Sequence, residues 1–487
     1  MKAPRKSVAP LRQAATPARR ALTQLGGKVE IWKDERGLGA LLETALDEAP
    51  DEAAAMRHVH GFHSYPARMH PDTAARLVSG LTTTGQTVLD PFSGSGTVLV
   101  EARLRGRVAY GIDANPLAVM LANLKLAGFR DDSERELLLA VIEAVVEYAD
   151  DRRRAKAGPS KPYGRTERAL FPPHVLLELD GLAKGIKEQC PPALAPTLWL
   201  VLSSLLTKVS HRKSDTSGQE VERRLASGFA IRFFKKKATE LVGRLSEYTR
   251  LLPDPRPKTS VKIGDARNLP MNDERAHAII TSPPYPGVYD YVEHHRMRLD
   301  WLGLDVKFLE QHEIGAHRHF ASSSPIDAEA RWAAQIGACL DEMRRVLVPG
   351  GKAVLLIADS VVARSAFYAD RALRDLASKH GLLIVAGASQ RREHYHAPSR
   401  EAFRAAPRRE HLIVFESSPG SRRVSSRDRA EKPPAVAAHS EPHPDGGTGS
   451  TAGASREQRT LSPLVRNHTG ARNAPQKPRK KRRPRVK

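Results

Sequence analysis

The sequence predicts an α/β fold built on a doubly wound, mostly parallel sheet. Seven short β-branched or apolar runs occur between residues 87 and 415, each bounded by turn residues. Helical patterns separate most of these runs, which favours parallel strands joined by crossover helices. Only a loop separates the last two runs, so we expect the final strand to be antiparallel. The seven runs are Thr87–Asp90, Val108–Ile112, Val261–Ile263, His277–Ile280, Lys352–Ile357, Leu382–Ala386 and His411–Phe415.

A long stretch without strand patterns interrupts this alternation. Ser133 and Glu136 form a capping box ahead of an apolar helical run, and three further helical patterns follow. We therefore predict a helical insertion at 131–258, which divides the sheet domain into a first part at 29–130 and a second part at 259–416. The three later helical patterns are Val175–Ile186, Leu198–Val209 and Ala238–Leu252.

Positive charge is concentrated at the two ends of the chain. The net charge is +23, of which residues 1–28 carry +7 and residues 417–487 carry +12, leaving only +4 for the rest. The composition of both ends predicts a disordered basic arm at 1–28 and a disordered basic tail at 417–487. Such ends attract phosphate backbones in a salt-dependent way. Solvated tails without a partner are the alternative.

The cysteine content and hydropathy bear on the compartment. Cys190 and Cys339 are the two cysteines of the chain, which excludes a disulfide framework or a cysteine-based zinc site and fits a reducing cytoplasm. No stretch reaches the ~20 apolar residues needed to span a bilayer. We expect a cytoplasmic protein without a membrane partner, and the basic ends make association with the nucleoid an option.

The first strand leads into a glycine-rich turn and then a helix, over Val88–Ala102. Glycine lets the backbone approach a ligand closely, and a loop at the carboxyl end of a parallel strand is where open α/β sheets bind ligands. Leu99 stands where a dinucleotide fingerprint would need its third glycine, and no Gly-Lys-Ser/Thr phosphate loop is present. A plain tight turn is the alternative. The candidate binding residues in this motif are Asp90, Phe92, Gly94, Gly96 and Thr97.

An acidic residue follows each of the next two strands. Asp113 lies about 20 residues after the glycines, where a carboxylate accepts hydrogen bonds from ribose hydroxyls. A helix cap is the other reading of Asp113. Asp265 follows the third strand and can accept a hydrogen bond from an adenine amino group, with a turn residue as the alternative reading.

Ser282-Pro283-Pro284-Tyr285 directly follows the buried fourth strand. The two prolines lack N–H donors and fix φ, so the backbone is stiff and its carbonyls point outward. The Ser282 hydroxyl and the Pro283 carbonyl can both accept from the N–H bonds of an exocyclic amino group, which pulls that group toward tetrahedral geometry. Tyr285 can stack on a base taken out of its helix. A simple turn is the alternative.

Together these motifs resemble those of the amino-methyltransferases of DNA. Phe92-Ser93-Gly94-Ser95-Gly96 is similar to their Phe-x-Gly-x-Gly cofactor motif, and Ser282-Pro283-Pro284-Tyr285 to their Asp/Asn/Ser-Pro-Pro-Tyr/Phe/Trp catalytic motif. The segment Phe62–Pro71 resembles the one that packs by the methionine end of the cofactor, so Tyr65 is a further candidate. Tyr285–Trp301 and the turn Val348–Lys352 are also typical of this group. The resemblance covers about 60–130 and 260–416.

The resemblance implies a Rossmann-like class I methyltransferase fold and S-adenosylmethionine as the cofactor. It implies direct methyl transfer to DNA, with Asp113 on the ribose, Asp265 near the adenine and the base between Ser282 and Tyr285. Serine in the first position of the catalytic motif is usual among cytosine-N4 enzymes, so cytosine N4 is the favoured target. Adenine N6 of DNA and an RNA base of the guanine-N2 type are the alternatives. A restriction endonuclease is a candidate partner.

The sequence departs from familiar members in one respect. It shows no target-recognition region after the catalytic core, so only 131–258 and 303–335 are available for that role. The rival classes are a non-catalytic nucleic-acid-binding protein and a methyltransferase of proteins or small molecules. We expect no metal, because the clustered histidines lack carboxylate or cysteine partners at regular spacing. These histidines are His58, His60, His63 and His70.

Overall fold

The computed structural model describes residues 27–46, 52–66, 68–320, 323–392 and 397–418. All of them fall within one compact unit, residues 1–432. The predicted basic arm before Gly27 and the predicted tail after Ser418 lie outside the described residues. Among the helices described, none is long and apolar enough to cross a membrane.

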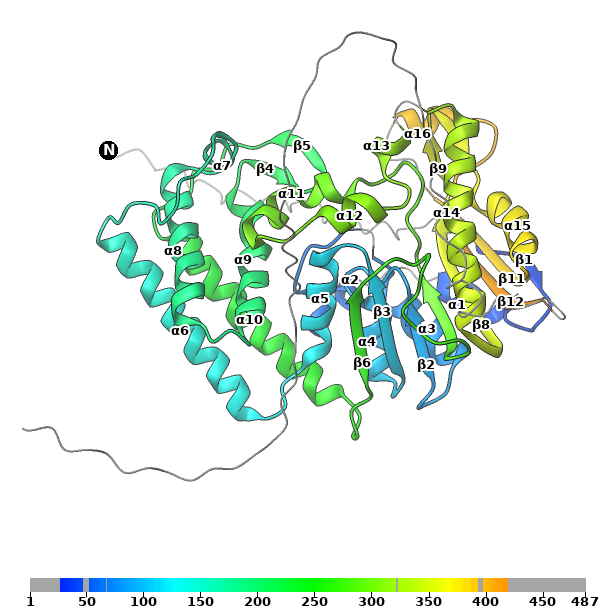
Figure 1. Ribbon diagram of the computed structural model, residues 1–487, viewed down its shortest axis with the longest axis horizontal. Helices are drawn as coiled ribbons and strands as arrows, with labels where there is room; N and C mark the ends of the chain where they lie inside the picture. Colours follow the sequence, from blue (N-terminus) through cyan, green and yellow to red (C-terminus); the bar gives the residue numbers. More distant parts are fainter. Residues whose placement is uncertain (1–26, 47–51, 67, 321–322, 393–396, 419–487) are drawn as a thin grey trace, which may run out of the picture. The chain divides into compact units, whose positions relative to one another are not determined.

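A central sheet of eight strands carries the fold (Figure 1). The strand order is β1-β11-β12-β8-β7-β2-β3-β6, with parallel pairing from β8 to β6 and antiparallel pairing among β8, β12, β11 and β1. This confirms the predicted Rossmann-like class I methyltransferase sheet and its antiparallel final strand. The strands are β1 (Glu30–Asp34), β2 (Thr87–Asp90), β3 (Val108–Asp113), β6 (Thr259–Ile263), β7 (Ala276–Thr281), β8 (Leu347–Ala358), β11 (Leu382–Arg391) and β12 (Arg409–Ser417).

The prediction of seven strands was wrong by one, because β1 adds an antiparallel edge strand beside β11. Its sequence, Glu-Ile-Trp-Lys-Asp, is short and mostly polar, so it carries neither an apolar run nor a clean alternation. Trp32 anchors β1 through its indole N–H, which donates to Ser389 Oγ at 3.0 Å. The same ring covers Gly387, where a Cβ atom would lie 2.1 Å from it.

Helices cover both faces of the sheet, and side chains that alternate along the strands form two apolar layers. One layer packs under α1 (Gly39–Leu46), α3 (Pro71–Leu81), α4 (Thr97–Leu104) and α5 (Pro116–Ala127). The other packs under α14 (Pro325–Val346) and α15 (Ala369–Lys379). The remaining short elements of the sheet domain are α2 (Glu52–Ala55), η1 (His58–Gly61), α11 (Tyr291–Leu302), α12 (Lys307–His312), α13 (His317–Phe320), β9 (Ser360–Val362), β10 (Ser365–Phe367) and α16 (Ala397–Ala402).

A helical bundle lies between β3 and β6 in the chain, on the side of α5 in Figure 1. Its first helix is capped by Asp131, whose carboxylate accepts from the backbone N–H of Glu134 at 3.0 Å, and not by the Ser133 box that the sequence suggested. A short hairpin, β4 (Arg212–Ser214) and β5 (Ser217–Glu220), was not predicted. The helices are α6 (Asp132–Arg154), α7 (Arg165–Leu170), α8 (Pro173–Gln189), α9 (Ala195–Val209) and α10 (Phe229–Leu251).

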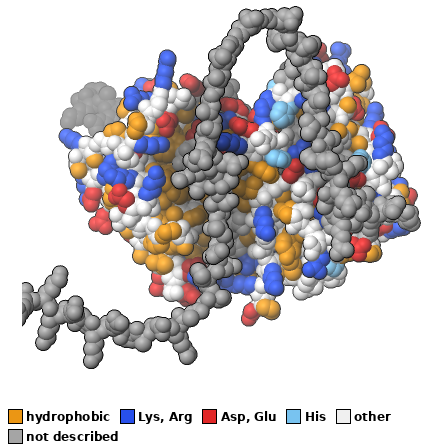
Figure 2. Space-filling view, viewed as in Figure 1, with side chains coloured by type: hydrophobic (Ala, Val, Ile, Leu, Met, Phe, Trp, Pro, Cys, Tyr) orange, Lys and Arg blue, Asp and Glu red, His pale blue; other side chains and the backbone are white. Residues whose placement is uncertain are grey.

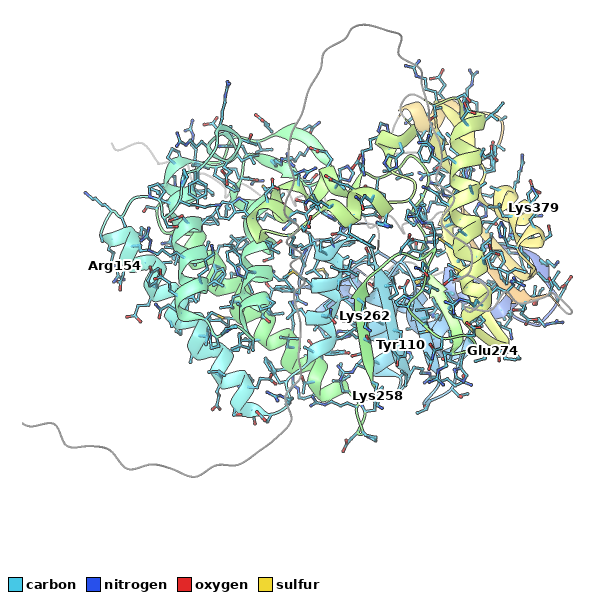
Figure 3. The ribbon with its side chains drawn as sticks, in the orientation of Figure 1. Tyr110, Arg154, Lys258, Lys262, Glu274 and Lys379 are labelled. Carbon is cyan, nitrogen blue, oxygen red and sulfur yellow. The ribbon has the colours of Figure 1, made fainter. Side chains whose placement is uncertain are left out.

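On the face shown in Figure 2, blue and red side chains are interspersed, which agrees with the small net charge of residues 29–416. The edge strand β6 carries the exposed Lys262, and Lys258 lies just before it (Figure 3). Lysines on an exposed edge strand oppose pairing with another chain.

Candidate functional site

The loop after β2 brings the backbone close to the cleft at the carboxyl ends of the strands. Gly94 has φ of +49° and lines the cleft, and a Cβ atom there would lie 3.5 Å from the ring of Tyr65. Gly96 has φ of +83° and faces α5, where a Cβ atom would come within 2.9 Å of Ala122. One glycine thus leaves room for a ligand, whereas the other permits close helix packing.

Besides Gly96, two further predicted residues of this loop do not line the cleft. Asp90 is buried, and its Oδ1 accepts from Thr281 Oγ1 at 2.6 Å and from the backbone N–H of Phe92 at 3.2 Å. Burial raises the pKa of Asp90 to about 7. Thr97 is buried at the start of α4. The geometry gives Asp90 a role in joining β2 to the end of β7, and direct cofactor contacts from both residues stay predictions.

Asp113 lies on the floor of the cleft at the end of β3. Its Oδ2 accepts from the backbone N–H of Gly94 at 2.7 Å, and its Oδ1 accepts from that of Asn115 at 2.8 Å. Burial raises the pKa of Asp113 to about 6. The helix cap of α5 is Asn115 itself, whose side chain accepts from Leu117 N–H at 3.0 Å. The capping role is therefore taken by Asn115, and the carboxylate of Asp113 faces the cleft.

Asp265 also lines the cleft, next to the end of β6. Its carboxylate already holds Arg267, whose Nε lies 2.9 Å from Oδ1 and 3.0 Å from Oδ2. An amino donor that reached Asp265 would share its oxygens with this guanidinium. The predicted contact with an adenine amino group stays a prediction.

The Ser282–Tyr285 loop leaves β7 at the other wall of the same cleft. Ser282 and Pro284 line the cleft, whereas Pro283 is buried. Ser282 Oγ lies 3.5 Å from Tyr285 Oη, which in turn lies 3.3 Å from Glu410 Oε1. The indole N–H of Trp332 donates to the carbonyl of Pro284 at 3.4 Å, so α14 supports the loop from behind.

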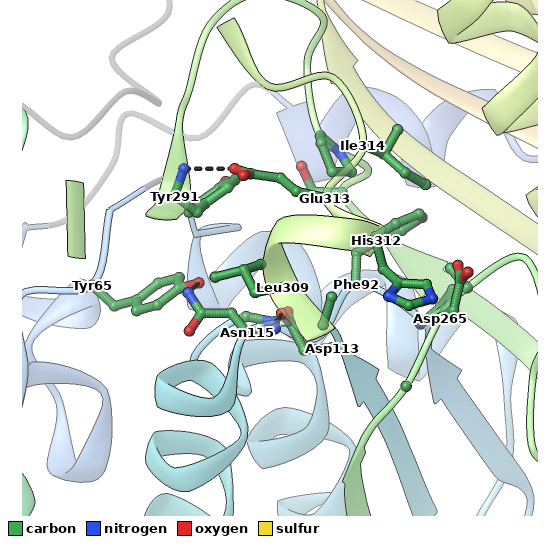
Figure 4. Close-up of a pocket in the computed structure, with 17 residues that line it drawn as sticks. Tyr65, Phe92, Asp113, Asn115, Asp265, Tyr291, Leu309, His312, Glu313 and Ile314 are labelled. Atoms are coloured by element: carbon green, nitrogen blue, oxygen red, sulfur yellow. Dashed lines mark hydrogen bonds between the residues drawn. The ribbon is translucent and has the colours of Figure 1, made fainter. Parts of the chain in front are cut away.

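A segment that the motifs did not identify covers the cleft. Figure 4 shows Leu309 close to Asp113 and the ring of His312 beside Asp265, and Ile314 also lines the cleft. Glu313 holds this segment in place, because its Oε1 accepts from the backbone N–H of Tyr291 at 2.6 Å. The empty space in the cleft is about 640 Å³, including the part that is open to solvent. No spacing rule would have found these residues, because they come from the short helix α12 and the two residues after it, where the sequence carries no motif.

Aromatic rings close the end of the cleft nearest the Phe62–Pro71 segment. Tyr65 lines the cleft and stacks on Tyr291, with ring centroids 6.4 Å apart. Asn115 Nδ2 lies 3.4 Å from Tyr65 Oη and 3.0 Å from His295 Nδ1. Burial lowers the pKa of His295 to about 3, so its ring is neutral and accepts this hydrogen bond. Tyr65 thus lies beside Gly94 of the glycine loop, and its place at the methionine end of the cofactor stays a prediction.

The clustered histidines are buried, and His60 and His63 bond to side chains of other elements. His60 Nε2 lies 2.7 Å from Glu101 Oε1, and His63 Nε2 lies 3.2 Å from Ser203 Oγ. Among the described residues, two groups bring three metal-type side chains together, His58 with His60 and Glu101, and Asp359 with Asp370 and His411. Arg105 binds the other oxygen of Glu101 at 2.5 Å. Neither group lies among the residues that line the cleft.

Residues 29–124 match the family model described as DNA methylase, of the N6/N4 type. This stretch contains the Phe62–Pro71 segment, the glycine loop and Asp113, and it ends before the insertion. The chain is 28% identical over 122 residues to the type II methyltransferase M.MjaII of Methanocaldococcus jannaschii, covering 25% of this chain and 23% of that protein. It is 25% identical over 268 residues to the type II methyltransferase M.MvaI of Kocuria varians, covering 51% and 58%.

The chain therefore spans between about a quarter and three-fifths of the length of these relatives. Among solved structures, it is similar to geranyl diphosphate C-methyltransferase from Streptomyces coelicolor A3(2), with 9% identity and a TM-score of 0.31. That alignment covers 72% of this chain and 77% of the other.

Proposed function

We propose, from the premise that residues 29–124 match the DNA methylase family of the N6/N4 type, that this protein is an S-adenosylmethionine-dependent methyltransferase of DNA that modifies an exocyclic amino group. One observation carries the proposal. The glycine loop with Asp113 and the Ser282–Pro284 loop line the two walls of a single cleft, so a cofactor held by the first can meet a base held by the second.

The residues on the first wall fit the cofactor. The Asp113 carboxylate, held by two backbone N–H groups, presents its remaining lone pairs to ribose hydroxyls. Phe92, Leu309 and Ile314 supply apolar surface for an adenine ring, and the gap between Gly94 and Tyr65 leaves space for the methionine end. When bound, S-adenosylmethionine supplies an electrophilic methyl group on sulfonium.

The second wall fits the amino group that receives the methyl. Ser282 Oγ and the Pro283 carbonyl accept its N–H bonds, and the ring of Tyr285 stacks on the flipped base. The rate enhancement comes from positioning the nitrogen in line with the methyl group and from stabilising the positive charge that grows on it. Serine at this position favours cytosine N4 as the target, with adenine N6 as the alternative.

We assign target recognition to the helical insertion at 131–258 and general DNA attraction to the basic ends. The insertion is large enough for this role, and its hairpin carries the exposed Lys213. The 17 Lys and Arg of residues 417–487 carry positive charge, which is attracted to the negative phosphate backbone of DNA. A restriction endonuclease remains a candidate partner.

The test is mass spectrometry of nucleosides from DNA and RNA after incubation with the protein and labelled S-adenosylmethionine. We expect label in N4-methylcytosine of DNA. Label in N6-methyladenine would change the base, and label only in RNA would overturn the DNA substrate.

A variant connects this activity to the catalytic loop. Ser282→Ala should lower the transfer rate at least ~100-fold, because it removes a group that positions the amino nitrogen. Its affinity for S-adenosylmethionine, measured by calorimetry, should stay within about twofold of wild type. Near-normal turnover in this variant would remove Ser282 from the mechanism.

A further inference from the structure

A chain of hydrogen bonds leads from Ser282 away from the cleft into the sheet. Ser282 Oγ donates to Tyr285 Oη over 3.5 Å, and Tyr285 Oη donates to Glu410 Oε1 over 3.3 Å. The guanidinium of Arg392 donates to the same carboxylate oxygen. The first two contacts are long, as catalytic hydrogen bonds often are before substrate binds.

The chain ends in a buried pair of charges. Glu410 is 2% exposed and Arg392 is 4% exposed. Glu410 lies on β12 opposite Ala358, the last residue of β8, and therefore at the same edge of the sheet as the end of β7. The cost of removing two charges from water offsets most of the attraction within a buried ion pair. A gain in folding stability therefore does not by itself explain why such a pair is present.

The chemistry of the two ends sets the direction of every hydrogen bond between them. A guanidinium only donates and a carboxylate only accepts. Tyr285 must therefore donate to Glu410, which leaves the lone pairs of its hydroxyl to accept from Ser282. Burial raises the pKa of Tyr285 above its ordinary value, so the phenol keeps its proton. Once Ser282 donates to Tyr285, only its lone pairs remain to face the cleft.

We propose that Glu410 and Arg392 are positioning residues that polarise the Ser282–Tyr285 hydrogen-bond chain, so that Ser282 presents lone pairs and not its proton to the amino group of the base. The proposal rests on the function proposed above. It explains how a hydroxyl, which can donate as well as accept, acts as an obligate acceptor. A side-chain carbonyl or carboxylate at position 282 would present oxygen lone pairs without this help.

The proposal predicts that the effect of a substitution at position 282 depends on the other members of the hydrogen-bond chain. Tyr285→Phe keeps the stacking ring but breaks the chain, and Glu410→Gln replaces the charged acceptor with a weaker neutral one. In the protein that retains Ser282, Tyr285→Phe should lower the single-turnover transfer rate about tenfold, the equivalent of one hydrogen bond. Glu410→Gln should lower it less. In the Ser282→Asn variant, whose amide oxygen accepts without help, both changes should cost less than about threefold.

The experiment measures transfer from tritiated S-adenosylmethionine to unmethylated plasmid DNA, together with the dissociation constants of both substrates. Tyr110→Phe, on β3, and Glu416→Gln, whose carboxylate pairs with Arg36, are the matched controls, because each makes the same chemical change outside this chain of hydrogen bonds. The dissociation constants for S-adenosylmethionine and DNA should stay within about twofold of wild type in all variants, so that the substitutions change the transfer rate and not substrate binding.

Three outcomes would overturn the proposal: a wild-type rate in Tyr285→Phe, an equal loss with and without the Ser282→Asn substitution, or an inactive Ser282→Asn protein. An equal loss in both backgrounds would mean that the chain only supports the fold. A wild-type protein that transfers no label to DNA would refute the proposed function and this proposal with it. That result is distinct from lost coupling in an active enzyme.

Discussion

At the scale of single residues, Asp113 shows how one carboxylate serves two purposes. Its two oxygens accept from backbone N–H groups of Gly94 and Asn115, which fixes the glycine loop against the end of β3. The same carboxylate faces the cleft, where burial raises its pKa to about 6. The group is therefore ionised at neutral pH and becomes protonated in mild acid.

This pKa predicts a pH dependence of cofactor binding. Ribose hydroxyls donate more strongly to an ionised acceptor, so affinity for S-adenosylmethionine should be constant above pH 7 and fall as pH drops through about 6. The affinity should fall by at most about tenfold per pH unit, because a single proton competes with the ligand. Titration calorimetry in buffers from mildly acidic to mildly alkaline pH measures this affinity.

Asp113→Asn provides the control for this prediction. The variant should bind the cofactor weakly and with no pH dependence over this range. Asp90, whose pKa burial raises to about 7, stays in place in the variant. A pH dependence that survives in Asp113→Asn would therefore assign it to Asp90, and a flat wild-type profile would contradict the prediction.

Sequence spacing located Asp113 because the strand-turn-helix unit places any residue at that offset on the ligand side of the sheet. It could not separate Gly94, which lines the cleft, from Gly96, which packs on α5. That distinction depends on where a neighbouring helix lies. His312 and Leu309 reach the cleft only because a segment distant in sequence folds back over it, and no local pattern records such a contact.

At the scale of elements, one buried arginine ties the helical insertion to the segment that follows the Ser282–Tyr285 loop. Arg298 on α11 is 1% exposed, and its Nη2 donates to Asp215 Oδ2 at 2.8 Å and to Thr207 Oγ1 at 2.9 Å. It also contacts Ser203 on α9 and Ser64, next to Tyr65. Although burial opposes it, this guanidinium holds the pKa of Asp215 below its ordinary value.

Asp215→Asn should therefore destabilise the protein by about 3–5 kcal/mol, the usual effect of leaving one buried charge without its partner. Glu310→Gln is the matched control. Glu310 on α12 pairs at 3.3 Å with Arg296, which lies on α11 like Arg298, but both of these side chains are exposed. That change should cost less than about 1 kcal/mol. Urea unfolding followed by circular dichroism measures both.

The difference between the two variants has a defined pH dependence. Because the pKa of Asp215 is lowered in the folded protein, its contribution is present above the ordinary carboxyl pKa and is lost as pH falls below it. Equal effects of the two substitutions at neutral pH would mean that Arg298 does not anchor the hairpin.

Element prediction succeeded where burial produces a sequence pattern and failed where pairing alone makes the strand. The runs that became β7 and β8 are buried on both faces and read as continuous apolar stretches. By contrast, β1 and the β4–β5 hairpin are short and mostly polar. Their hydrogen bonds to a neighbouring strand, not their composition, make them strands.

At the scale of the whole molecule, charge is divided between a nearly balanced sheet domain and two cationic ends. The face shown in Figure 2 mixes both signs, whereas residues 417–487 carry 17 Lys and Arg against five Asp and Glu. Binding by such a segment releases counterions from DNA and weakens as salt rises. The cleft and the cationic tail should therefore contribute separately, to chemistry and to attraction.

A chain that ends at Ser418 tests this division. It should bind non-specific DNA more weakly and with a shallower slope of log affinity against log salt, by about 0.9 for each phosphate that the tail no longer neutralises. Its transfer rate at saturating DNA should stay within about twofold of the full chain, because no residue of the cleft is removed. A full-length variant with the eight Lys and Arg of residues 477–487 changed to Ser should show part of the same decrease. Identical salt slopes in all three proteins would place DNA attraction on the folded unit, and the insertion would become its main source.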